Sequence, residues 1–108
     1  MRTFETGATR DDNTHKPDYS GFLCPFALKR FGAYMQKHQQ QADGGMRDAS
    51  NWKKGMPISA YKESLIRHTV DFWAAYEGGN MDEAEELACA IFFNVQGFLH
   101  ERLKERGV

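Results

Sequence analysis

The chain has 108 residues with 14 basic and 15 acidic side chains, so its formal net charge is −1. This length fits one small domain with a single core, and the aromatic content argues against a disordered chain. The balanced charge gives no support to a general nucleic-acid or membrane surface. No apolar run approaches membrane-spanning length, and the charged start Met1–Glu5 is not a signal peptide. We therefore expect a soluble, cytoplasmic protein.

The two cysteines, Cys24 and Cys89, lie in separate predicted helices and lack the CxxC spacing of redox and zinc sites. Cys89 is expected to project away from the apolar centre of its helix, and Cys24 precedes a proline. This pattern predicts two free thiols in a reducing compartment, without a disulfide.

The first 22 residues are polar, and Gly7, Pro17 and Gly21 interrupt any periodicity. They predict an extended arm that either lies on the protein or reaches a partner, and a partly mobile terminus is the alternative. Pro25 is well placed in the first turn of a helix that runs to about Gln41. The following residues Ala-Asp-Gly-Gly are a strong stop signal.

Residues 42–57 form a long connection that is rich in polar and cationic groups. It contains Arg47, Asn51, Trp52, Lys53 and Lys54. Structureless connections of this length are usually functional or disordered. The indole ring could pack on the core or stack on a base, and the lysines could meet phosphate.

Two amphipathic helices follow, from about Pro57 to Tyr76 and from Met81 to about Arg106. Apolar residues recur in both at three- and four-residue spacing, and Gly78-Gly79-Asn80 separates them. No internal repeat and no strand alternation is present. The sequence therefore predicts an all-α fold, a small bundle of three main helices in one domain spanning residues 1–108.

Polar edges beside the apolar stripes of these two helices form the candidate site. They carry His68, Asp71, Glu83, Glu86, Asn94 and Glu101. An asparagine in mid-helix is a poor helix former, and Gly97 costs about 1 kcal/mol relative to alanine in a helix interior. Close approach of two helices could explain Gly97 without a ligand, and a solvated face explains the neighbouring acids Asp82 and Glu85.

Carboxylate and amide oxygens are ligands of hard cations such as Mg²⁺ and Mn²⁺. We therefore predict that Asp71, Glu83, Glu86 and Asn94 hold such an ion against a phosphate group. Glu83 or Glu86 could orient or deprotonate water. His68 could ligate the metal, contact phosphate or hydrogen-bond Asp71. The chain lacks a Walker loop and the GxGxxG, HExxH, GxSxG and His-Asp motifs.

Five short motifs appear in one order along the chain. They are Glu5–Asp11, Lys16–Tyr19, Asn51–Gly55, Arg67-His68 and the Glu86-to-Asn94 spacing. Together they resemble small phage and prophage proteins labelled dATP/dGTP diphosphohydrolase, amino-terminal type, which are similar to MazG-like all-α nucleotide pyrophosphohydrolases. The resemblance implies metal-dependent hydrolysis of a purine deoxynucleoside triphosphate to the monophosphate and pyrophosphate. It also implies residence in the host cytoplasm if a phage encodes the chain.

The resemblance implies a substrate side as well. The phosphates would meet Arg10, Lys16, Lys54 and Arg67, and the base would meet Trp52, with Asn51 beside it. The MazG pattern of ExxE on one helix and ExxD on the next is replaced here by His68-x-x-Asp71 and Glu83-x-x-Glu86. Cys89 stands where a further acid would fall, so Asn94 could supply the missing ligand.

Three helices make only a shallow cleft, so we expect a homo-oligomer, a dimer or a tetramer, in which a second subunit closes the site. The alternative function is a non-catalytic helical module of phage or prophage origin that binds a protein partner. It rests on aromatic residues, including Trp73, Phe92 and Phe93, that one small bundle cannot bury on all sides.

Overall fold

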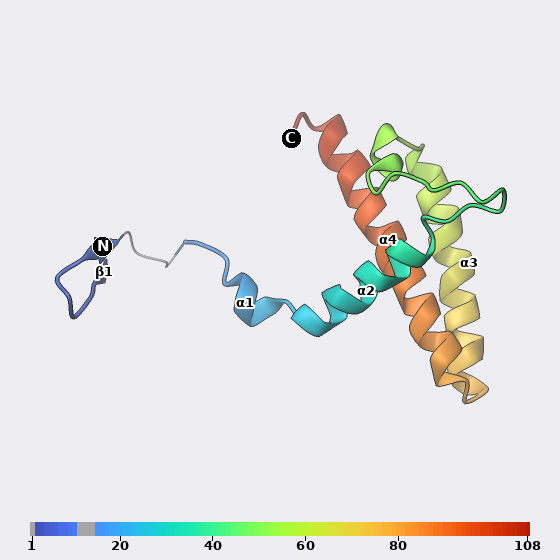
Figure 1. The fold of residues 1–108 in the computed structure, drawn as a ribbon, viewed down its shortest axis with the longest axis horizontal. Helices are drawn as coiled ribbons and strands as arrows, with labels where there is room; N and C mark the ends of the chain where they lie inside the picture. The colour runs from blue at the N-terminus through green and yellow to red at the C-terminus, as the bar shows by residue number, and fades with distance from the viewer. Residues whose placement is uncertain (1, 11–14) are drawn as a thin grey trace.

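The computed structural model describes residues 2–10 and 15–108. Its elements are β1 (Arg2–Thr3), β2 (Thr9–Arg10), α1 (Tyr19–Phe22), α2 (Pro25–Lys37), the 3₁₀ helix η1 (Asn51–Lys54), α3 (Ile58–Glu77) and α4 (Met81–Glu105). The predicted all-α fold is confirmed, with α2, α3 and α4 as its main helices. Figure 1 shows α3 and α4 side by side, with α2 crossing α4. None of the described helices has the length and apolarity that a bilayer crossing requires.

The antiparallel pair of α3 and α4 is the body of the molecule. The turn between them uses Gly79 at a φ of +75°, a conformation that glycine adopts without steric cost. The Asn80 side chain then accepts a hydrogen bond from the Glu83 amide at 3.1 Å, which caps the start of α4. Both features agree with the stop and start signals in the sequence.

Tyr61 and Gly97 set the distance between these two helices. Tyr61 is 1% exposed and lies against Gly97 on α4. A Cβ atom at Gly97 would come within 2.7 Å of Cδ1 of Tyr61 and closer still to Cε1 and Cζ. Close helix approach therefore accounts for Gly97, as the sequence had left open, and no ligand is needed to explain it.

The core is small and lies mainly on one side of α4. Its buried members are Tyr61, Ala84, Cys89, Ala90, Asn94 and Gly97. Cys89, which the sequence places away from the apolar centre of its helix, is nevertheless buried, and it lies close enough to the crossing helix α2 for the charges of Arg30 and Lys37 to act on its thiol. Both cysteines are free, as predicted, with Cys24 exposed and Cys89 buried.

Helix α2 packs on α4 through aromatic rings, with Phe31 and Phe92 at a centroid distance of 4.4 Å. It ends at Lys37, four residues before the predicted end at Gln41. The chain turns back after His38, because Gln40 forms an antiparallel bridge to Met46 and the Arg47 amide donates to the Gln39 carbonyl at 2.6 Å. The long connection is thus ordered by this bridge and by η1, and it is not structureless.

The amino-terminal arm also has more local structure than predicted. Strands β1 and β2 pair antiparallel, with Arg2 opposite Arg10, and Asp18 caps the short helix α1 by accepting from the Gly21 amide at 3.2 Å. Figure 1 shows the arm projecting beyond α4, on the side away from α3. Asp11, the last residue of the first motif, lies outside the described residues.

Candidate functional site

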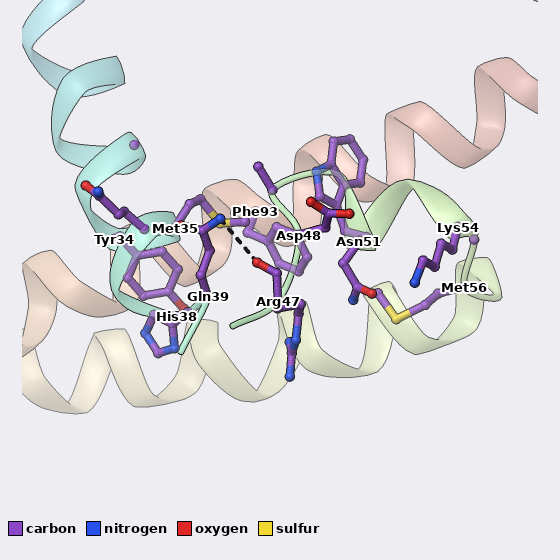
Figure 2. Close-up of a pocket in the computed structure, with 15 residues that line it drawn as sticks. Tyr34, Met35, His38, Gln39, Arg47, Asp48, Asn51, Lys54, Met56 and Phe93 are labelled. Atoms are coloured by element: carbon purple, nitrogen blue, oxygen red, sulfur yellow. Dashed lines mark hydrogen bonds between the residues drawn. The ribbon is translucent and has the colours of Figure 1, made fainter. Parts of the chain in front are cut away.

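A groove of about 800 Å³ lies between the carboxyl-terminal half of α2, the segment that includes η1, and one side chain of α4. We call it the α2–η1 groove. The residues that matter most to its chemistry are Tyr34, Met35, His38, Arg47, Asp48, Asn51, Trp52, Lys54 and Phe93. Figure 2 shows Tyr34 and His38 at one end, Arg47 and Asn51 in the middle, and Lys54 at the other end. The volume lies within the usual range for small-molecule sites.

Aromatic and apolar side chains form one wall of the groove. Trp52 packs edge-on against Phe93 at a centroid distance of 6.3 Å and against His100 at 4.8 Å. The packing interpretation of Trp52 is therefore confirmed, although the residue also lines the groove. The ring centroids of Tyr34 and His38 are 4.3 Å apart, and burial raises the pKa of the Tyr34 hydroxyl.

The polar part of the groove opens into an adjoining hollow of about 580 Å³. Both hollows share Gln39, Arg47, Asp48, Asn51 and Lys54. In the described part of the chain, neither Arg47 nor Lys54 forms an ion pair. Their charges are therefore free to meet an anionic group, and Asp48 lines both hollows as well.

The backbone around Arg47 is held firmly. The Gln39 side chain donates from Nε2 to the Arg47 carbonyl at 3.2 Å, the dashed line in Figure 2, and the Arg47 amide donates back to the Gln39 carbonyl. These two bonds fix where the guanidinium leaves the backbone. The Arg47 backbone is thus tied to the turn that follows α2.

Glu86, a predicted metal ligand, is engaged elsewhere. Arg30 Nη2 lies 2.8 Å from one carboxylate oxygen of Glu86, and Lys37 Nζ bonds the other. Hydrogen bonds from Lys37 and then from Arg30 lower the pKa of Glu86 to about 2. Glu85 also bonds Arg30. Glu86 therefore holds α2 on α4 as part of an ionic cluster, and its oxygens already have partners.

The other predicted ligands lie in different surroundings. Asn94 is buried, and its Nδ2 donates to the Ala90 carbonyl at 2.8 Å within α4. Asp71 and Glu83 are exposed on α3 and α4. His68 is half-buried, and its Nδ1 is enclosed with no hydrogen-bond partner among the described residues.

Among residues 2–10 and 15–108, no group of three or more His, Cys, Asp or Glu side chains could hold a metal ion. The predicted ligands Asp71, Glu83 and Glu86 are therefore not brought together as one such group in the described chain, and a site for Mg²⁺ or Mn²⁺ that also uses Asn94 stays a prediction. The physical reason is that helical periodicity identifies a shared flank but not what covers it. Here α2 brings two cations to Glu86, and the α3–α4 contact encloses Asn94.

The structure brings together only some of the predicted substrate-binding residues. Asn51, Trp52 and Lys54 meet in the groove. Arg67 does not, because it is exposed on α3 and donates to Ser64 Oγ at 3.1 Å. Arg10 in β2 and Lys16 before α1 belong to the projecting arm, away from the groove.

Sequence reasoning missed Arg47, Tyr34 and His38 as groove residues. For Arg47 the sequence did carry a signal, because Arg47 lies in the same connecting segment as Lys54, residues 42–57. Tyr34 and His38 lie one turn apart at the end of the helix that leads into that connection.

Comparisons with known proteins add no further assignment. No protein-family model, no curated protein and no solved structure matches the chain. The interpretation of the site therefore rests on the geometry of the α2–η1 groove together with the motifs in the sequence.

Proposed function

We propose that the chain binds a purine deoxynucleoside triphosphate in the α2–η1 groove and hydrolyses it to the monophosphate and pyrophosphate. The observation that carries the binding part is an aromatic wall in the same groove as two cations, Arg47 and Lys54, that form no ion pair with residues 2–10 or 15–108. The choice of reaction and of purine deoxynucleotides comes from the resemblance stated above.

The aromatic wall suits a flat base. Tyr34, Met35 and Phe93 offer apolar and aromatic contact area, and aromatic rings stack on or meet bases edge-on. Asn51, between the wall and the cations, presents an amide with two donors and an acceptor for a base or sugar edge. The adjoining polar hollow then receives the triphosphate.

The cations suit the triphosphate. Arg47 presents a planar fork of donors that matches phosphate oxygens in pairs, and Lys54 acts as a point charge. In the proposed reaction a water oxygen bonds to the α-phosphorus as the bond from that phosphorus to the bridging oxygen breaks and pyrophosphate leaves. Asp48, the carboxylate common to both hollows, is the residue proposed to accept the proton from that water.

Mg²⁺ and Mn²⁺ remain predictions from the sequence and enter the test as variables. Purified protein is incubated with dGTP or dATP, with either ion or with a chelator, and the products are separated. We expect pyrophosphate and the monophosphate, and neither free phosphate nor triphosphate. The absence of turnover of both nucleotides under all conditions would refute hydrolysis.

Binding is tested separately from turnover by calorimetry with dGTP. Lys54→Ala and Arg47→Ala should each weaken binding about 10- to 100-fold, because a hydrogen bond to a charged group contributes about 1.5–3 kcal/mol. Lys29→Ala is the matched control, since Lys29 is an exposed cation on α2 outside the groove. Equal affinities for all three variants would show that the groove is not the nucleotide site.

A non-catalytic, protein-binding module is the second candidate. It is favoured by the exposure of large apolar residues such as Phe22 and Phe26. Nucleotide would then leave the thermal unfolding midpoint unchanged, whereas a ligand that binds the folded chain raises it.

A further inference from the structure

One face of α4 is apolar and mostly exposed along its length, although its member Phe92 packs in part against Phe31 of α2 at a ring-centroid distance of 4.4 Å. Its members are Met81, Ala88, Phe92, Val95, Leu99 and Leu103, all of them exposed. We call this set the outer stripe. At 100° per residue it lies on the side of α4 opposite Gly97 and Ala90, which are buried. Because α4 also has an apolar inner side, it carries apolar residues on two opposite sides, with charged residues between them.

A second bare apolar surface lies at the start of the helical part of the chain. Within Tyr19–Phe26, which we call the overhang, Tyr19, Phe22, Leu23 and Phe26 are all exposed, Phe22 at 77% and Phe26 at 80%. Figure 1 shows α1 and the first turns of α2 extending past α4, on the side away from α3. The outer stripe is on that side of α4, so the two surfaces border one open corner.

The chain exposes more surface than a compact protein of its mass. Its accessible surface is 8620 Å², whereas a compact monomer of 12.4 kDa exposes about 6,100 Å². Its radius of gyration is 18.8 Å, against about 13 Å for a compact chain of this length. Part of this excess of roughly 2,500 Å² belongs to the projecting arm, whose described residues are all exposed. A remainder of about 1,000 Å² per chain reaches the range of an obligate dimer, which buries about 2,000–5,000 Å² in total.

We propose that a second copy of this chain occupies the corner, so that the overhang of each copy covers the outer stripe of the other. A second copy is the occupant because each chain carries both unpartnered surfaces, and a two-fold axis covers both at once. No residue of the α2–η1 groove belongs to either surface. The inference therefore stands apart from the proposed hydrolysis, and either can fail alone.

The test is the mass of the full-length protein in solution, measured by light scattering after size exclusion at several concentrations. We expect about twice 12.4 kDa for the wild type. Leu99→Asp on the outer stripe and Phe26→Asp on the overhang should each halve that mass. Val70→Asp is the matched control, since Val70 is 56% exposed on α3, outside both surfaces, and Leu99 is 51% exposed.

Folding is checked by circular dichroism. Phe26 is 80% exposed in its own chain, so Phe26→Asp removes almost no packing within that chain and should leave its fold intact. This variant therefore still tests the interface if Leu99→Asp loses helicity. A monomeric wild type would overturn the proposal. So would an oligomer whose mass survives both Leu99→Asp and Phe26→Asp, or one that is split by Val70→Asp.

Discussion

Replacing Gly97 with alanine tests whether Tyr61 sets the spacing of α3 and α4. The added Cβ would lie 2.7 Å from Cδ1 of Tyr61 and closer to two further ring atoms, whereas carbon atoms in good contact are about 3.5–4.0 Å apart. Tyr61 is 1% exposed, so the ring has no solvent to move into. The substitution must either separate the helices or rotate a buried ring.

The expected size follows from two opposing effects. Overpacking a well-packed core costs about 1–3 kcal/mol, and the contact here is severe enough for the upper end. Alanine returns about 1 kcal/mol through its better helix propensity. We therefore expect a net loss of about 2 kcal/mol, or a fall in Tm on the order of 10 °C for a chain of this length.

The assay is urea unfolding followed by far-ultraviolet circular dichroism at one fixed protein concentration. Gly32→Ala is the matched control, because Gly32 is inside α2 and a Cβ there meets nothing within 4 Å. It should gain about 0.5–1 kcal/mol from helix propensity alone. If Gly97→Ala is as stable as the wild type, or gains stability as Gly32→Ala does, the assignment of Tyr61 as the spacer is refuted.

Three further outcomes are expected. Two cations on α2 hold the pKa of Glu86 at about 2, below its ordinary 4.5, so its ionised form stabilises the fold above pH 4.5 and that contribution is lost as the pH falls toward 2. Glu86→Gln should remove this part of the acid dependence of the unfolding midpoint, and Glu83→Gln, on an exposed side chain of the same helix, should not. A thiol reagent should label Cys24 in the native protein and Cys89 only after unfolding, because Cys24 is exposed and Cys89 buried; equal labelling rates would contradict the packing of α2 on α4. Trp52 fluorescence should shift when dGTP binds the groove, and an unchanged spectrum at saturation would place the nucleotide elsewhere.

The helix pair could be predicted because its signals are local. Apolar spacing, the Gly78-Gly79-Asn80 turn and the acidic start of α4 all act within a few residues of one another. The residue at which α2 ends could not be predicted, because Gln39–Gln41 are compatible with a helix. In the structure these residues leave the helix and pair with Met46 and Arg47. Long-range pairing overrides propensity there.

The candidate site divides in the same way. Asn51, Trp52 and Lys54 are close in sequence and meet in one groove, so their grouping could be predicted. The flank that Glu86 and Asn94 share on α4 predicts a common metal site. It does not predict the position of α2, whose cations reach Glu86, or the depth of the α3–α4 contact, which encloses Asn94.

The bridge between Gln40 and Met46 has a practical consequence for labelling the protein. It closes a short loop over residues 40–46, and backbone hydrogen bonds hold the base of this loop, including the bond from the Gln41 amide to the Gly45 carbonyl at 2.8 Å. Gly44 at the tip of the loop is exposed and has a φ of +87°. Each doubling of the length of a closed loop raises the entropic cost of closing it by only about 0.6 kcal/mol. A peptide tag inserted at this tip would thus lie outside the molecule and could be used to immobilise the protein, while the residues that line the groove keep their positions.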